Sequence, residues 1–176
     1  MATPLLGFTE PQPADPPDGA AQITLLANEV DTWGGSGAAL GAAYKTTEQT
    51  TTQAAGLFYD LTGLSSTALQ GGFTLGVSTL VVPTSGLYRV SAFQRTRCVS
   101  AETYHAVAVR DGGGNVLGQA YAATVPAGSN VTPGFTGIYR LTAASTLALA
   151  LLGNGNEVTI YATAENSGLS AEWVGP

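Results

Sequence analysis

Residues 80–90 read LVVPTSGLYRV and predict a strand, a tight corner and a second strand. Pro83 has no backbone N–H and a fixed φ, so it suits the end of a strand better than its centre. Gly86 can adopt the positive φ that a tight corner often needs. After this glycine the side chains alternate between two faces, with Tyr88 and Val90 on the same one. The stretch therefore predicts two strands joined at a compact corner.

The composition is typical of an all-β protein with many short turns and a weakly charged surface. Hydrophobic residues make up 44% of the 176-residue chain, charged residues only 10%, and 23 residues are glycine. Soluble domains average about 25% charged residues. A neutral surface favours a subunit that covers area against copies of itself or against another protein, because monomers usually carry more surface charge. A solvated sandwich rich in Ser and Thr is the alternative.

Nine short segments after residue 53 have the pattern of β-strands. The turns at residues 111–115 and 153–156 contain the Gly and Asn that hairpins require. The apolar run at 147–152 has the length of a buried strand and is far shorter than a membrane span of about 20 residues. We therefore expect a β-sandwich domain over residues 54–176, with strands at 56–61, 73–82, 87–97, 104–110, 116–125, 136–143, 146–152, 157–164 and 169–174.

The corner formed by Val82, Pro83, Gly86 and Tyr88 resembles the strand corner of the C1q/TNF-like jelly rolls, a family of trimeric β-sandwiches. The resemblance extends over most of the predicted domain, including its closing strand with Trp173. It implies an all-β fold of the C1q/TNF-like jelly-roll type. It also implies that the protein is a homotrimer.

The first 53 residues differ in character from the predicted sandwich. Residues 1–18 contain five prolines and are expected to form an extended arm. Residues 19–33 predict a short helix, and a Gly/Thr-rich linker follows to residue 53. Because an isolated helix of this length is marginal in water, its apolar stripe must pack on the sandwich or on another protein. We assign that stripe as the residues that anchor the chain to a partner: Ile23, Leu26, Val30 and Trp33.

Residues 11–27 are similar to the N-terminal segments of minor structural proteins in tailed bacteriophages. In those proteins a Pro-rich lead and a short Ala-rich helix precede a fibre or receptor-like domain. The resemblance implies a protein of the virion surface that is made in the host cytoplasm. Its partners would be other virion proteins, such as the major capsid protein or a fibre or tail component. An extended tail without such a role is the alternative, because Pro-rich termini are also common in disordered segments.

Residue types that carry catalysis are sparse in this chain. His105 is the single histidine, so a nucleophile–base pair would have to include it, and a buried structural histidine is the more common case. Cys98 is the single cysteine, which argues against a disulfide and a Cys-based zinc site and favours a buried apolar role. The carboxylates are scattered, with Glu102 placed in a loop. We therefore expect no enzyme activity, no cofactor and no metal site.

The charges argue against nucleic acid as a partner. The formal net charge is −6, and all six basic residues lie between Lys45 and Arg140. A protein that tracks phosphates needs a basic face, which this distribution does not provide. The chain also begins without a cationic flank before an apolar stretch, so we expect no signal peptide and no membrane insertion.

Two sets of side chains suggest a contact surface on the sandwich. Arg95 and Arg97 share a strand face and could bind an anion or sialic acid, although a solvated face or an intersubunit salt bridge is the more common outcome. Tyrosines on the predicted strands could line a trimer axis or a sugar platform. The candidate trimer-interface or ligand-surface residues are Tyr88, Arg95, Arg97, Tyr104, Tyr121 and Tyr139.

These observations favour a non-enzymatic virion protein, namely a trimeric capsid decoration protein held by its arm. The alternative is a tip of a tail or head fibre that binds a host receptor or a host-surface carbohydrate.

Overall fold

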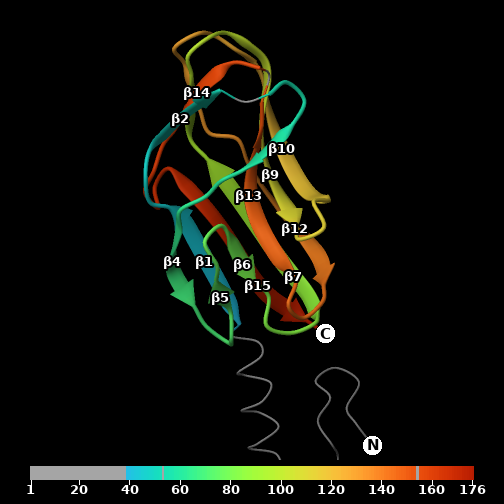
Figure 1. Cartoon of the computed structure of the whole chain (residues 1–176). Helices are drawn as coiled ribbons and strands as arrows, with labels where there is room; N and C mark the ends of the chain where they lie inside the picture. The colour runs from blue at the N-terminus through green and yellow to red at the C-terminus, as the bar shows by residue number, and fades with distance from the viewer. Residues whose placement is uncertain (1–38, 53, 154) are drawn as a thin grey trace, which may run out of the picture.

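The computed structural model describes residues 39–52, 54–153 and 155–176 (Figure 1). Strands, turns and loops make up these ranges, and no helix occurs within them, which confirms the prediction of an all-β fold. Every strand pairing is antiparallel. The helix expected at 19–33, with Ile23, Leu26, Val30 and Trp33, lies outside the described residues. Across the part of the chain that is described, no helix has the length and apolarity to cross a membrane.

The first sheet has five strands in the order β12-β7-β15-β1-β4. Two of them, β7 and β15, are nine residues long and lie side by side at its centre. The bounds are β12 Gly134–Leu141, β7 Gly86–Gln94, β15 Ser167–Gly175, β1 Leu40–Lys45 and β4 Leu64–Leu69.

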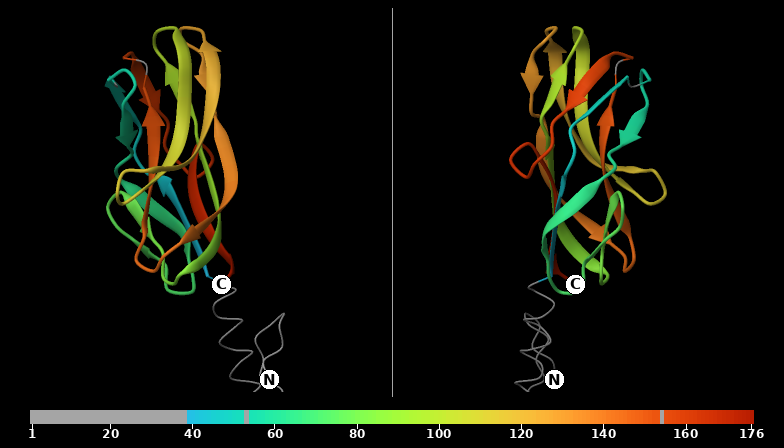
Figure 2. Two further views of the ribbon diagram at one scale, coloured as in Figure 1. Left: turned by 90° about the vertical axis from the view of Figure 1, so that its right-hand side faces the viewer. Right: turned by 60° about the vertical axis from the view of Figure 1, so that its left-hand side comes forward.

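The second sheet follows the order β10-β9-β13-β6-β5, and β3 also pairs with β13. It forms the opposite layer of an elongated sandwich (Figure 2). Its bounds are β10 Val116–Val125, β9 Glu102–Asp111, β13 Thr146–Leu152, β6 Thr79–Val81, β5 Thr74–Leu75 and β3 Phe58–Asp60.

A smaller third sheet, of order β11-β8-β14-β2, extends the first layer toward the end of the molecule away from the C-terminus (Figure 1). Each of its strands is next in sequence to one strand of the first sheet: β11 to β12, β8 to β7, β14 to β15 and β2 to β1. These strands therefore follow the same order in both sheets. Chain irregularities at places such as Arg95 separate the two sheets. The bounds are β11 Asn130–Val131, β8 Thr96–Cys98, β14 Glu157–Ile160 and β2 Gln49–Thr52.

The stretch at residues 80–90 forms the expected corner. β6 ends at Val81, β7 begins at Gly86, and the Tyr88 hydroxyl donates a 2.8 Å hydrogen bond to the Thr84 carbonyl between them. Tyr88 is fully buried and its ring meets Phe73 edge to face, with 5.9 Å between ring centroids. The corner is therefore tied to the core by a single aromatic side chain.

The structure corrects two expectations about where strands begin and end. The Gly/Thr-rich segment before residue 54 was expected to be a linker, yet β1 and β2 lie within it, and β1 pairs with β15 and β4. The expected strand at 87–97 is two strands, because Arg95 interrupts the strand and the next strand, β8, pairs within the third sheet. Small residues have weak intrinsic strand preference, so pairing with neighbours decides these segments.

Candidate functional site

On the outer surface of the first sheet, side chains at paired positions on neighbouring strands form three rows that run across the strands. We call this surface the outer sheet face. Its middle row contains only small side chains from all five strands: Thr136, Ser91, Ser170, Ala42 and Ala68. The Ser91 and Thr136 hydroxyls lie 2.8 Å apart and hydrogen bond to each other. This row leaves the backbone of the sheet close to the surface.

The second row, nearer the far end of the molecule, is aromatic. Phe93 lies between Gly134 on β12 and Gly168 on β15, and a Cβ atom at Gly168 would overlap its ring. Gly168 leaves room for the ring over β15, and Gly134 lies against the Cβ atom of Phe93 on the other side. Tyr44 on β1 is also half-buried and lies beside the same part of the face.

The third row, on the other side of the small residues, combines apolar and paired charged groups. Ile138 is 63% exposed and is the large apolar side chain that this row presents on β12. It lies opposite Arg89, which donates a 2.9 Å hydrogen bond to Glu172 on β15. Leu40 follows in register on β1. The charges in this row therefore neutralise each other within one chain.

Two shallow hollows follow from this arrangement, one on each side of Phe93. The first has a volume of about 190 Å³ and includes Tyr44, Thr67, Ser91 and Ser170 in its lining. The second, about 410 Å³ and more open, lies on the β12 side of Phe93 and includes Ser91, Gly134 and Thr136 in its lining. Their linings offer hydroxyl groups, methyl groups and aromatic rings. The outer sheet face is therefore suited to binding rather than to proton transfer or nucleophilic attack.

Tyr88 is not available to any surface, which corrects its assignment as an interface or ligand residue. The alternation correctly placed it on one face of β7, but that face is the interior one. Tyr139 also points inward, from β12, and is half-buried where its hydroxyl and the Phe135 ring lie against Gly118 of β10. Both tyrosines serve the packing of the sandwich.

The other predicted surface residues do not gather in one place. Tyr104 and Tyr121 lie on the opposite layer, diagonally across the β9–β10 pair, and Tyr121 is 55% exposed. Arg95 and Arg97 are exposed near the third sheet, and Arg95 lies over the Tyr161 ring at 5.1 Å. The remaining candidates therefore occupy two separate surfaces, neither of which is the outer sheet face. Sequence patterning missed that face because its middle row is made of residues with no distinctive chemistry.

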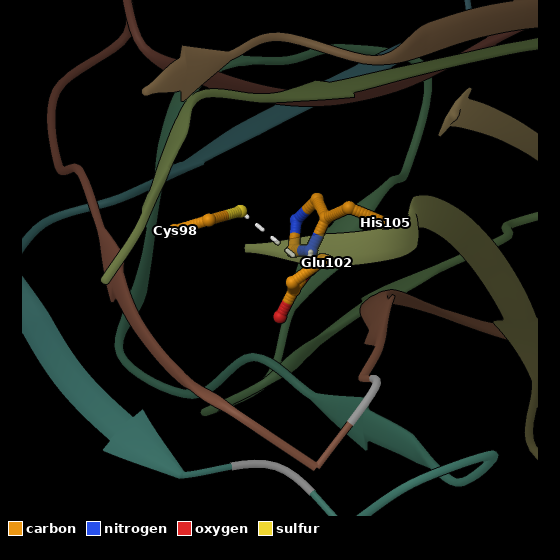
Figure 3. A group of neighbouring side chains, drawn as sticks. All are labelled: Cys98, Glu102 and His105. Atoms are coloured by element: carbon orange, nitrogen blue, oxygen red, sulfur yellow. Dashed lines mark hydrogen bonds and ion pairs between the residues drawn. The ribbon is translucent and has the colours of Figure 1, made fainter. Parts of the chain in front are cut away.

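A second feature lies inside the sandwich, between the third sheet and β9. Cys98, Glu102 and His105 converge there and are all buried (Figure 3). Glu102 Oε2 lies 3.0 Å from His105 Nδ1 and accepts a hydrogen bond from the Cys98 thiol at 3.5 Å. The other ring nitrogen, His105 Nε2, lies 2.8 Å from the Thr96 hydroxyl. We call these four residues the buried polar cluster.

Burial in the buried polar cluster disfavours the charged forms of the Cys98 thiol and the His105 ring. Burial raises the pKa of the Cys98 thiol to about 12, and the neighbouring Glu102 carboxylate adds to the rise. Burial lowers the pKa of His105, against an opposing influence from Glu102. The thiol contacts the carboxylate and not the imidazole, so the order needed for a Cys–His nucleophile is absent from this cluster. Both ring nitrogens of His105 have polar partners, which agrees with the prediction of a buried, structural histidine.

Comparisons with known proteins bear on the fold alone. No protein-family model matches the chain, and no curated protein matches it in sequence. Among solved structures, Eiger TNF from S. frugiperda superposes with a TM-score of 0.61 at 12% identity, over 76% of this chain and 91% of that one. Murine APRIL at pH 5.0 gives 0.62 at 9% identity, over 77% and 98%. The described domain is therefore a TNF-like jelly roll, as the strand corner predicted.

Proposed function

We propose that the protein is a non-enzymatic structural subunit that forms a homotrimer through the outer sheet face. The observation that carries this proposal is the row of small side chains, which lies between the exposed Ile138 and the half-buried ring of Phe93. Small residues allow a neighbouring subunit to approach the sheet closely, and the flanking apolar side chains supply area to bury. The resemblance to a family of trimeric sandwiches supports three as the number of subunits.

The paired charges of the third row support the same proposal. Covering an unpaired charge is expensive, whereas Arg89 and Glu172 already form an ion pair within one chain. A neighbouring subunit could therefore cover the row without supplying a counter-charge. In a closed ring of three, each copy would use the outer sheet face against a different surface of the next copy.

We further propose that the trimer decorates a bacteriophage capsid, held by the N-terminal segment. Support comes from the likeness of residues 11–27 to the leading segments of phage minor structural proteins. The chain also enters the sandwich beside its own C-terminal strand, with the Trp173 amide 3.0 Å from the Ala39 carbonyl. An anchor before residue 39 would hold that end of the sandwich near the shell, and the third sheet would face outward (Figure 2).

The trimer is tested by the mass of the full chain in solution. Light scattering coupled to size exclusion is expected to give three times the mass of one chain, because the apolar rows on the outer sheet face are covered only in the assembly. The mass should stay constant on dilution through the micromolar range. A mass of one chain at every concentration contradicts the proposal.

The anchoring role is tested by deleting residues 1–33, which include Ile23, Leu26, Val30 and Trp33 and leave every described strand intact. The deleted protein is expected to keep the β-sheet signal in circular dichroism and to remain a trimer, but to be absent from purified particles. Trp33→Ala alone is expected to weaken incorporation most among single changes, since buried indoles often dominate interfaces. Normal incorporation of the deletion would contradict the anchoring role.

One observation favours the second candidate, a carbohydrate-binding fibre tip. The hollow beside Tyr44 and Phe93 combines aromatic rings with the hydroxyls of Thr67, Ser91 and Ser170, which suits a sugar ring. The two candidates use the same face and exclude each other there. Saturable binding of a host-surface glycan by the full chain, lost in Phe93→Ala, would favour the fibre tip.

A further inference from the structure

We propose that Cys98, Glu102 and His105 form a structural binding site for one divalent metal ion of the zinc type, held between the two layers of the sandwich.

The spacing of the three donor atoms fits a metal ion. A thiol sulfur, a carboxylate oxygen and an imidazole nitrogen all lie within 4.8 Å of one another. The sulfur and Glu102 Oε2 are 3.5 Å apart, and Oε2 and His105 Nδ1 are 3.0 Å apart. Ligands around a tetrahedral zinc ion, with bonds of about 2.0 to 2.3 Å, are separated by about 3.3 to 3.6 Å. Two of the three pairs are therefore within a few tenths of an ångström of metal-ligand spacing, and a bound ion would draw the third pair, Cys98 Sγ and His105 Nδ1, closer than its present limit of 4.8 Å.

The supporting contact of the histidine is also that of a metal ligand. A ligating histidine usually offers its second ring nitrogen to a fixed partner, which sets the tautomer and the orientation of the ring. His105 has this partner in Thr96, whose buried hydroxyl contacts Nε2 and leaves Nδ1 directed at Glu102 Oε2. Figure 3 shows the side chains of Cys98, Glu102 and His105 close together. Thr96 and Cys98 lie in β8, whereas Glu102 and His105 lie in β9. Two strands therefore position all four residues.

Glu102 supplies an independent sign that the cluster binds a cation. Its second oxygen, Oε1, is buried and has no hydrogen-bond partner among the described residues. Buried carboxylate oxygens are rarely left without partners, because the loss of hydration is costly. A bound cation would compensate the carboxylate, with Oε1 or a water molecule available for the fourth coordination position.

Charge balance and donor type together select the class of metal. A divalent ion with one thiolate, one carboxylate and one neutral imidazole gives a site of zero net charge, which an apolar interior tolerates. The metal would displace the thiol proton and take the place of the hydrogen bonds to Glu102. Sulfur and nitrogen donors suit zinc and are poor ligands for magnesium or calcium. The expectation of no metal site rested on the lone cysteine, the lone histidine and the scattered carboxylates, and it did not consider these three residues as one mixed set.

The test uses the untagged full chain, stripped with a chelator and dialysed. Zinc added to this protein is expected to bind with one ion per chain by elemental analysis after gel filtration. It should raise Tm by about 5 °C or more at saturation. Cobalt(II) in place of zinc is expected to give the charge-transfer absorption of a cobalt–thiolate bond.

Variants assign the binding to these residues. Cys98→Ala and Glu102→Gln are expected to weaken zinc binding by about 100-fold or more, and Thr96→Val by about 10-fold through the loss of ring orientation. Glu165→Gln, which changes an exposed carboxylate elsewhere, should bind zinc as the unaltered protein does. Circular dichroism checks the fold of each variant.

Three outcomes would overturn the proposal. One is a chelator-stripped protein that takes up less than a tenth of an equivalent of zinc. Another is a cobalt complex without thiolate absorption, which would place the metal away from Cys98 whatever the variants do. The third is unaltered zinc affinity in folded Cys98→Ala and Glu102→Gln proteins.

Discussion

Replacing Tyr88 with alanine is expected to lower the free energy of unfolding by about 3–5 kcal/mol, the range seen when large aromatic side chains are removed from cores. The side chain is fully buried, packs edge to face on Phe73 and ties the corner at Thr84 to β7. Its loss leaves a cavity, removes the aromatic contact and unpairs a carbonyl at the corner. Urea denaturation at one fixed protein concentration measures the change, because assembly contributes to apparent stability.

Two companion variants separate the causes. Tyr88→Phe keeps the ring and removes only the hydrogen bond, so it should cost about 1–2 kcal/mol. Tyr121→Ala removes the same type of side chain from an exposed position and should change stability by less than about 1 kcal/mol. Equal losses in Tyr88→Ala and Tyr121→Ala would show that the corner does not depend on Tyr88.

Ile138→Asp is expected to convert the proposed trimer into monomers while leaving each sandwich folded. The side chain is exposed within one chain, so a charge there is solvated in the monomer. In the trimer it would be covered beside Arg89, which is already paired with Glu172, so the added carboxylate has no counter-charge of its own and costs several kcal/mol to bury at each of three equivalent contacts. Light scattering should report the mass of one chain, with an unchanged circular dichroism spectrum.

Val77→Asp is the matched control, since Val77 is 81% exposed in the turn between β5 and β6, away from the outer sheet face. This variant should keep the mass of the unaltered protein. If Ile138→Asp also remains a trimer, the subunits meet through a different surface. If both variants dissociate, the added charge and not its position is responsible.

Segments with strong local signals could be predicted from the sequence. The apolar run of β13 and the corner from Pro83 to Tyr88 each specify a strand or turn through their own residues. β1 and β4 could not be predicted, since LGAAYK and LSSTAL contain mostly small or polar residues. These strands exist because β15 and β1 offer them open edges to pair with, and an edge is a property of the folded sheet.

The candidate sites divide in the same way. Burial of Cys98 was predicted because a lone cysteine is typically an interior residue. Glu102 was assigned to a loop, although it begins β9 and is buried beside His105. A usable signal was present: three metal-ligand residue types occur within eight positions across a short turn. The outer sheet face gives no such signal, because its small side chains matter only through their register across five strands.

The first and last segments of the described domain lie side by side. Ala39 hydrogen bonds to Trp173 at the edge where β1 and β15 pair, so a short linker could join residue 176 to residue 39. New ends could then be opened in the exposed turn at residues 111–115, between two strands that pair over most of their length. Such a circular permutant would keep every strand pairing while moving the point of attachment to another part of the surface. The position of the chain ends, and not the fold, therefore decides which part of the sandwich surface is attached to a partner.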